Sequence, residues 1–259
     1  MDKINIIKIG GNIIDDHNKL ELFLEEFARL PGKKILVHGG GKLATRMAEQ
    51  MGIQQEMIEG RRITDEETLR VVTMVYAGYI NKNIVAQLRA KDCKAVGICG
   101  ADADIIRAHK RDALIDYGYV GDIDTVRIKA MKRLLKTVDT IVIAPITHDG
   151  AGQLLNTNAD TIAQEVAKAL SNNYKTQLIF SFEKAGVLLD VADEHSVITK
   201  LKPKMYKQLK NEERIFAGMI PKLDNAFAAL KAGVHRVYIG QAEHLPDLLE
   251  GRCGTKIEI

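Results

Sequence analysis

Several features that mark common protein classes are missing from this sequence. Its 259 residues include no tryptophan and only three cysteines, Cys93, Cys99 and Cys253, with no CxxC pair. An odd number of irregularly spaced cysteines argues against a disulfide framework and favours a reducing compartment. The seven histidines are scattered without zinc-like spacing, so no metal site is predicted. We therefore expect a cytoplasmic protein.

Long apolar runs and a one-sided charge are also missing. The apolar run near the N-terminus is too short for a signal peptide or a membrane span, and no later run approaches the roughly 18 residues that a span needs. The 37 basic and 34 acidic residues leave a net charge of only +3. This balance predicts neither a nucleic-acid nor a membrane partner, but it leaves a small anionic substrate open, because substrate binding needs only a local field.

What is present is the composition and patterning of an α/β protein. The 46% of hydrophobic and 27% of charged residues are ordinary for a globular chain. Short β-branched runs alternate with longer amphipathic stretches, which predicts a parallel sheet with helices on both faces. The predicted strands cover residues 4–9, 34–37, 95–98, 140–144, 177–182 and 235–239. The predicted helices cover residues 19–30, 43–51, 65–88, 129–135, 159–170 and 223–231.

Three local features refine this organisation. Thr64 and Glu67 have the spacing of a capping box and predict a helix start. Residues 104–124 lack a helical period and predict a hairpin that leaves the sheet. The interruption at 149–152 is the best boundary, so we expect two lobes, 1–150 and 151–259, that share one continuous sheet.

Glycines follow the first two predicted strands. Lys8 precedes Gly10 and Gly11, and the run 39–41 is all glycine. Glycine lets a backbone approach an anion closely and present N–H groups to it, and a lysine adds a point charge. Gly39-x-Gly41-x-x-Ala44 also matches a loose dinucleotide fingerprint, so an oxidoreductase stays a distant alternative. No GxxxxGK[ST] phosphate loop occurs.

Polar residues open two of the later helices. Asn156, Asn158 and Asp160 alternate before the predicted helix at 159–170 and exceed what one helix cap needs. Lys222 lies at the start of the last long helix, where a cation is electrostatically unfavourable unless an anion is bound nearby. Arg62, by itself a weak signal, could clamp a carboxylate with two hydrogen bonds.

These signals converge because the carboxyl ends of parallel strands and the N-termini of the following helices meet at one sheet edge. Lysines, glycine N–H donors and one organising acid at that edge suit phosphoryl transfer, in which catalysis is mostly positioning and charge stabilisation. A non-catalytic effector-binding protein is a further alternative, but a binder needs no pair of lysines around an acid.

The assembled motifs resemble the amino-acid kinase family over essentially the whole chain. The resemblance implies a three-layer αβα sandwich around an open, mainly parallel sheet of about eight strands. It implies transfer of a phosphoryl group from ATP, with Mg²⁺, to the γ-carboxylate of N-acetyl-L-glutamate, giving N-acetyl-L-glutamyl 5-phosphate in arginine biosynthesis. The motifs that carry it are Lys8-x-Gly10-Gly11, His38-Gly39-Gly40-Gly41, Arg62, Asn156-x-Asn158-x-Asp160 and Gly218-Met219-x-x-Lys222.

The resemblance also implies a role for each matching residue. Lys8 and Lys222 would stabilise the transferring phosphoryl group, and Asp160 would hold both lysines. The residues 1–150 would bind the acylated glutamate and form a homodimer, and 151–259 would bind ATP. The implied ATP-binding residues are Gly10, Gly11, Asn12, Glu183, Gly186, Leu188 and Phe216, and the implied substrate-binding residues are Gly40, Gly41, Arg62, Asn156 and Asn158.

The chain departs from the family pattern near the expected ligands. Phe182-Glu183-Lys184 stands where many relatives have Ser-Asp-Val, and Ala217-Gly218-Met219 where some have Asp-Gly-Met. The basic residues Arg61, Lys82 and Arg107 near the substrate segments leave N-succinyl-L-glutamate open as an alternative acceptor. No extra helix precedes the first strand, which predicts a plain homodimer without arginine feedback.

Overall fold

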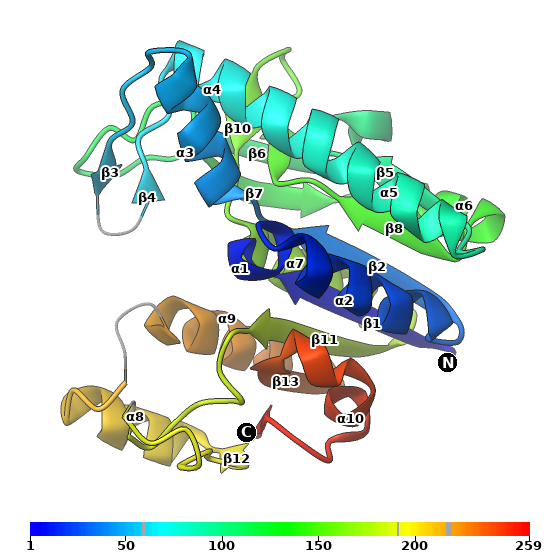
Figure 1. Ribbon diagram of the computed structural model, residues 1–259, viewed down its shortest axis with the longest axis vertical. Helices are drawn as coiled ribbons and strands as arrows, with labels where there is room; N and C mark the ends of the chain where they lie inside the picture. Colours follow the sequence, from blue (N-terminus) through cyan, green and yellow to red (C-terminus); the bar gives the residue numbers. More distant parts are fainter. Residues whose placement is uncertain (59–60, 191, 216–218) are drawn as a thin grey trace.

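The computed structural model describes residues 1–58, 61–190, 192–215 and 219–259, and its centre is one eight-stranded sheet (Figure 1). All neighbouring strands in this sheet run parallel except β13 and β14. From edge to edge the order is β12 (Lys200–Leu201), β14 (Thr255–Ile257), β13 (Arg236–Gln241), β11 (Lys175–Phe182), β1 (Lys3–Ile9), β2 (Lys33–His38), β8 (Thr140–Ile143) and β5 (Ala95–Ile98).

Helices cover both faces of this sheet and give the predicted three layers. Side chains alternate along a strand, so Ile4 and Ile6 face one helical layer while Ile7 and Ile9 face the other. The first layer holds α6 (Ile128–Thr137), α7 (Ala159–Leu170), α8 (Pro203–Asn211) and α9 (Ile220–Lys231). The second holds α1 (Gly11–Ile14), α2 (His17–Arg29), α3 (Gly41–Gln50), α4 (Glu66–Thr73), the π-helix η1 (Met74–Ile80), α5 (Asn81–Ala90) and α10 (Leu245–Glu250).

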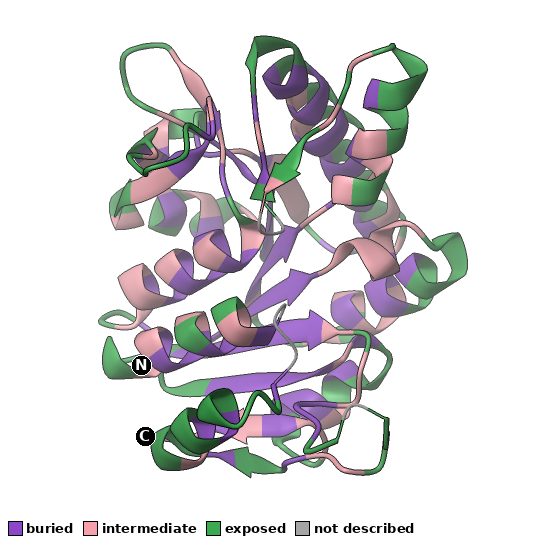
Figure 2. Ribbon diagram, turned by 90° about the vertical axis from the view of Figure 1, so that its left-hand side faces the viewer, coloured by how far each residue is buried: buried purple, intermediate pink, exposed green. Residues whose placement is uncertain are grey.

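The central strands are buried on both faces, whereas the helices keep exposed outer sides (Figure 2). Such strands read as nearly continuous apolar runs, which is why the sequence pattern predicted them. None of the helices in the described residues combines the length and apolar composition needed to cross a membrane.

A smaller sheet extends from the main one and contains the predicted hairpin. Its strand order is β10 (Leu154–Asn156), β9 (Ile146–His148), β6 (Ile106–Lys110) and β7 (Gly121–Val126). The antiparallel pair β6–β7 confirms the hairpin predicted within 104–124. A short hairpin, β3 (Met57–Ile58) with β4 (Arg61–Arg62), and two 3₁₀ turns, η2 (Asp102–Asp104) and η4 (Ala242–His244), complete the described elements.

The sequence pattern missed the small sheet apart from β6–β7, the short β3–β4 hairpin, the edge strands β12 and β14, and helices α8 and α10. The proposed boundary at 149–152 falls in the turn between β9 and β10, which pair with each other. The main sheet runs through both predicted lobes, since β1, β2, β5 and β8 continue into β11 to β14.

The predicted helix over 65–88 is in fact three consecutive segments, α4, η1 and α5. The capping-box prediction was wrong by one residue, because Asp65 is the N-cap and its Oδ1 accepts a hydrogen bond from the Thr68 backbone N–H at 2.8 Å. Thr64 is fully buried, and its hydroxyl donates to the Arg62 carbonyl oxygen instead.

This cap predicts a stability difference between neighbouring carboxylates. Asp65→Ala removes the cap bond and should lower the free energy of unfolding by about 1 kcal/mol. Glu67→Gln, at an exposed site in the same helical turn, should cost less than about 0.5 kcal/mol through the helix dipole alone. Urea unfolding of both variants measures the difference, and equal losses would contradict the assignment of Asp65 as the cap.

Candidate active site

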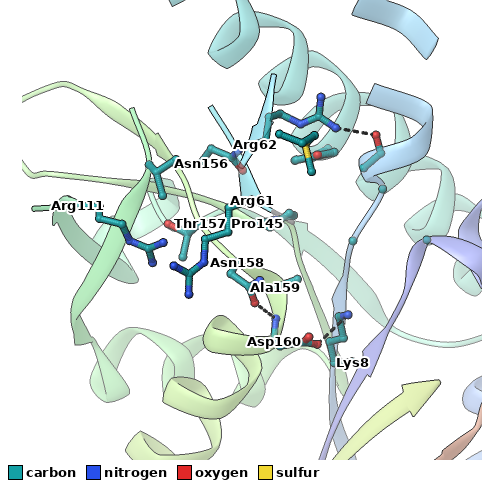
Figure 3. Close-up of a pocket in the computed structure, with 17 residues that line it drawn as sticks. Lys8, Arg61, Arg62, Arg111, Pro145, Asn156, Thr157, Asn158, Ala159 and Asp160 are labelled. Atoms are coloured by element: carbon teal, nitrogen blue, oxygen red, sulfur yellow. Dashed lines mark hydrogen bonds and ion pairs between the residues drawn. The ribbon is translucent and has the colours of Figure 1, made fainter. Parts of the chain in front are cut away.

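A buried ion triad lies where β1, α7 and α9 meet. Lys8 Nζ lies 2.7 Å from Asp160 Oδ1, and Lys222 Nζ donates to Asp160 Oδ2 at 2.6 Å (Figure 3 shows the Lys8 contact). Lys8 shares the strand face of Ile4 and Ile6, which α7 and α9 cover, so alternation along β1 aims it at Asp160. The three residues predicted to be catalytic are thus brought together by the fold.

Burial and the charges within the triad shift the pKa values of Asp160 and Lys8. Burial opposes ionisation of Asp160, but the ammonium groups of Lys8 and Lys222 outweigh it and hold the pKa of Asp160 at about 2. Burial lowers the pKa of Lys8, against the attraction of Asp160, and the neighbouring Lys222 lowers it further. The site therefore holds two lysines and one carboxylate, a positive surplus suited to an anionic ligand.

The predicted glycine loops lie beside this triad. Gly10 is the N-cap residue of α1, and Gly11 is its first residue. Gly40 precedes α3 with φ of +145°, a conformation that favours glycine. Both loops therefore place helix N-termini, with their free N–H groups, next to a pair of lysines.

A cavity of about 300 Å³ opens on one side of the triad, lined by Lys8, Asp160 and the glycine loop at 39–41 (Figure 3). We call it the acceptor-side cavity, because all five residues predicted to bind the acceptor line it: Gly40, Gly41, Arg62, Asn156 and Asn158. These five residues are up to 118 positions apart in the sequence and are brought to one cavity by the fold, since Gly40 follows β2 whereas Asn158 precedes α7.

Each polar member of this group also has a structural partner. The Arg62 guanidinium donates to the Gly41 carbonyl oxygen at 3.0 Å, to Thr45 Oγ1 at 2.8 Å, and to Gln55. Asn156 Nδ2 donates to Thr64 Oγ1 at 3.0 Å. These contacts hold the side chains in place around the cavity without using all of their hydrogen-bonding groups.

Asn158 has a clear structural task. It is the N-cap of α7, where its Oδ1 accepts hydrogen bonds from the Asp160 and Thr161 backbone N–H groups at 2.8 and 3.1 Å. The cap orders the first turn of the helix that carries Asp160. Its side-chain carbonyl is therefore already engaged, and only its amide N–H groups remain for a ligand.

Two further cavities continue from the first along the same edge of the sheet. One of about 210 Å³ shares Lys8 and Gly11 with the acceptor-side cavity, and Gly10, Asn12 and Lys222 also line it. The next, of about 150 Å³, shares Phe182 and Glu183 with this middle cavity. The predicted nucleotide residues Glu183, Gly186 and Leu188 line this last cavity, whereas Phe216 lies outside the described residues.

The structure adds lining residues that sequence reasoning did not single out. Tyr76 from η1 lines the acceptor-side cavity, and Ser181 from β11 lines the middle one. Arg111 also lines the acceptor-side cavity, and its guanidinium contacts Asp122 Oδ1 at 2.5 Å. Of these three residues, only Arg111 lies in the segment 104–124, where the sequence predicted a hairpin that leaves the sheet.

The basic residues considered for a larger acyl group do not act together. Arg61 lines the acceptor-side cavity. Lys82 instead donates to Asn81 Oδ1 and to the Gly97 carbonyl oxygen, at 3.0 and 2.9 Å. Arg107 pairs with Asp104 at 2.7 Å. Two of the three side chains are thus engaged by protein groups outside that cavity.

Lysines and glycine loops gathered at one edge of an α/β sheet suit phosphoryl transfer. The chain belongs to the amino acid kinase family, whose model matches residues 3–241. The three-layer α/β architecture predicted from the resemblance is therefore confirmed.

The chain is also similar to individual enzymes over nearly its whole length. The chain is 51% identical to an acetylglutamate kinase of Cytophaga hutchinsonii over 99% of both chains. It is 50% identical to an acetylglutamate kinase of Phocaeicola vulgatus over 92% of this chain and 93% of that one. A solved carbamate kinase from Giardia lamblia bound to AMP-PNP shares the fold at 16% identity, with a TM-score of 0.70 over 99% and 98% of the two chains.

These similarities decide between the alternatives left open above. The dinucleotide-dependent oxidoreductase is wrong, because the chain belongs to a kinase family and its glycine run follows the second strand of the kinase sheet. The N-succinyl alternative is not favoured, since the relatives named here are acetylglutamate kinases and two of the three basic residues invoked for it are engaged elsewhere.

The triad predicts a pH-dependent contribution to stability. Asp160 has a lower pKa in the folded chain, about 2, than its usual value of 3.8. Its contribution, about 2 kcal/mol, is therefore present above pH ~4 and lost as the pH falls towards 2. Asp160→Asn leaves two buried ammonium groups uncompensated and should cost about 3–5 kcal/mol at pH 7.

Urea unfolding at pH 7, 5, 4 and 3 measures this contribution. The difference between wild type and Asp160→Asn should stay constant from pH 7 to 5 and shrink below pH 4. Asp2→Asn, at an exposed position, serves as the control and should track the wild type. A difference that stayed constant down to pH 3 would contradict the depressed pKa.

Proposed function

We propose that this chain transfers the γ-phosphoryl group of ATP to the γ-carboxylate of N-acetyl-L-glutamate, giving N-acetyl-L-glutamyl 5-phosphate in arginine biosynthesis. The observation that carries the proposal is the row of three neighbouring cavities, with the Lys8–Asp160–Lys222 triad between the first and the middle one. The identity of the acceptor is inferred from the acetylglutamate kinases to which the chain is about 50% identical.

The acceptor needs no general base. A side-chain carboxyl group has a pKa of about 4.3, so the nucleophile is already ionised at neutral pH. We assign the N–H groups of Gly40 and Gly41 to the reacting carboxylate. Arg62 and Asn156, with Asn158, line the same cavity and suit the α-carboxylate.

In the transfer step, the acceptor carboxylate and the ATP phosphates are both negatively charged and repel each other. Lys8 and Lys222 offset the charge that spreads over the phosphoryl oxygens, and Asp160 holds their ammonium groups within one site. The N–H groups of Gly10 and Gly11, at the start of α1, complement the ATP phosphates. The position of the triad between the acceptor cavity and the ATP cavities supports this assignment.

ATP occupies the middle and last cavities in this proposal, with Asn12 beside the phosphates and Glu183, Gly186 and Leu188 on the adenosine side. Phe216 stays a prediction on that side. Among the described residues, no three His, Cys, Asp or Glu side chains form a metal-holding group. Mg²⁺ is assigned to the substrate as MgATP, since Mg²⁺ prefers phosphate oxygens and water to an all-protein cage.

Assembly and location belong to the same proposal. The lobe at 1–150 would bind the acceptor and dimerise, and the lobe at 151–259 would bind ATP. A homodimer is supported by exposed apolar side chains on the helical surface of the first lobe, with Tyr79 exposed to 66% and Met74 to 48%. A cytoplasmic location is supported by the three free cysteines and by the use of ATP.

The reaction is tested with MgATP and each candidate acceptor, with hydroxylamine added to trap the acyl phosphate. N-acetylglutamate should support ADP release and hydroxamate formation, and free glutamate, aspartate and N-succinylglutamate should give far less. Lys222→Met should keep its fold and lose about 10²–10³-fold in kcat, by analogy with removal of one oxyanion donor. A variant that retained near-wild-type turnover would contradict the role of Lys222.

The dimer is tested by the mass of the chain in solution. Wild type should show twice the chain mass in light scattering. Tyr79→Glu places a charge on the apolar surface and should shift the population towards monomer. Leu114→Glu, at another exposed apolar side chain but in the hairpin, is the matched control and should stay dimeric. A monomeric wild type would contradict the proposal.

A further inference from the structure

His38 is a buried polar side chain that the phosphoryl-transfer chemistry does not use. It ends β2, directly before the glycine run at 39–41, and is 0% exposed. Its Nδ1 lies 2.9 Å from the Gly39 carbonyl oxygen, and its Nε2 lies 3.2 Å from Asn81 Nδ2. Both ring nitrogens therefore have a partner within hydrogen-bond distance.

The surroundings of Asn81 determine which ring nitrogen carries the proton. Asn81 begins α5 directly after η1 and is also fully buried. Its Oδ1 accepts a hydrogen bond from Lys82 Nζ at 3.0 Å, and its Nδ2 donates to the Val142 carbonyl oxygen at 3.1 Å. Because an ammonium group only donates and a carbonyl only accepts, the amide cannot be turned around.

Asn81 Nδ2 is therefore a donor to His38 Nε2, and Nδ1 is the protonated nitrogen that donates to the Gly39 carbonyl. A neutral ring is consistent with its environment. Burial, together with the Lys82 ammonium group, lowers the pKa of His38 to about 4, against the opposing effect of the bond to Gly39. The tautomer is thus the same throughout the neutral pH range.

The bond to Gly39 also orients the next N–H group. The Gly39 carbonyl and the Gly40 N–H belong to one planar trans peptide and point in opposite directions. His38 therefore holds the carbonyl on its buried side and turns the Gly40 N–H away from itself. Gly40 lines the acceptor-side cavity, and within the described residues its N–H donates to no protein acceptor.

Packing leaves this loop little freedom on its other side. A Cβ added to Gly40 would lie 2.3 Å from Ile80 Cδ1 and 3.3 Å from the Tyr76 ring, so η1 presses directly on the loop. A Cβ added to Gly97 would lie 2.1 Å from Asn81 Oδ1, so β5 makes room for the amide. The glycine loop is thus held between the His38–Asn81 pair and the π-helix.

We propose that His38 is a positioning residue of the kinase: its Nδ1–H bond to the Gly39 carbonyl, with Asn81 holding Nε2, aims the Gly40 N–H at the acceptor carboxylate. This inference rests on the proposed function and deepens it. A side chain that only filled the core would need no hydrogen bond to the loop, whereas Nδ1 of His38 lies 2.9 Å from the Gly39 carbonyl oxygen.

Two substitutions separate the two ring nitrogens. His38→Asn places an amide near the position of Nδ1 and keeps a donor for the Gly39 carbonyl. His38→Gln places its amide near Nε2, keeps the contact to Asn81 and loses the bond to Gly39. We expect kcat/KM for N-acetylglutamate to fall by about 10- to 100-fold in His38→Gln, with the KM for ATP changed by less than about twofold. His38→Asn should retain activity within about threefold of wild type.

A matched control is Gln177→Leu, outside the active site. Gln177 is also buried, and its side chain donates to the Leu249 carbonyl oxygen at 2.6 Å, a bond that the substitution removes. It should lower stability and leave both KM values unchanged. Equal losses in the two His38 variants, or losses shared by ATP and acceptor, would overturn the inference while leaving the kinase proposal intact. A folded wild type without turnover would instead overturn the proposed function.

The tautomer supplies a readout that does not depend on either variant folding. ¹⁵N NMR of histidine-labelled wild type distinguishes a protonated from an unprotonated ring nitrogen. A neutral His38 ring with the proton on Nδ1 at pH 7 supports the inference. A proton on Nε2, or a charged ring at that pH, overturns it.

Discussion

One buried carboxylate between two ammonium groups organises this molecule. Asp160 lies within 2.7 Å of both Lys8 and Lys222, and the three side chains come from a strand and two helices that are far apart in sequence. Two lysines this close would repel each other strongly in a buried site, so the carboxylate is what allows both to point at one place. The group thus ties β1 to α7 and α9.

The parallel sheet explains why the ligand cavities lie in a row. Strand carboxyl ends and helix N-termini share one edge, and the three cavities follow that edge from the Arg62 side to the Leu188 side. Neighbouring cavities share lining residues, Lys8 and Gly11 in one case and Phe182 and Glu183 in the other. In the proposed arrangement, an acceptor in the first cavity and ATP in the other two would therefore meet at the triad without a large movement.

The glycine loop at 39–41 is supported by packing on both of its sides. A loop of three glycines is flexible as an isolated chain, yet here His38 contacts one side and the π-helix residues Tyr76 and Ile80 pack on the other. A π-helix is uncommon and often marks a functional region. Its position directly against Gly40 suggests why the long amphipathic stretch is not one regular helix.

Much of this architecture was readable in the sequence. Local signals are carried by residues near one another, so the buried strands, most helices and the glycine loops followed from β-branched runs, amphipathic periods and Gly-Gly pairs. The motifs of Lys8, Asp160 and Lys222 were recognisable in order along the chain. Edge strands such as β12 and β14, with two and three residues, were too short to leave a periodic signal.

Only the tertiary structure decided which side chains share a space. Arg111 and Tyr76 line the acceptor-side cavity because a hairpin and a π-helix fold over it, and neither has a distinctive local pattern. The tautomer of His38 depends on Asn81, Lys82 and Val142, which meet only in the folded chain. The sequence by itself thus determined most of the central strands and helices and the residue types of the candidate site, because these depend on local chemistry. The folded chain determined the partners of each side chain, because hydrogen bonds and ion pairs depend on distances between remote segments.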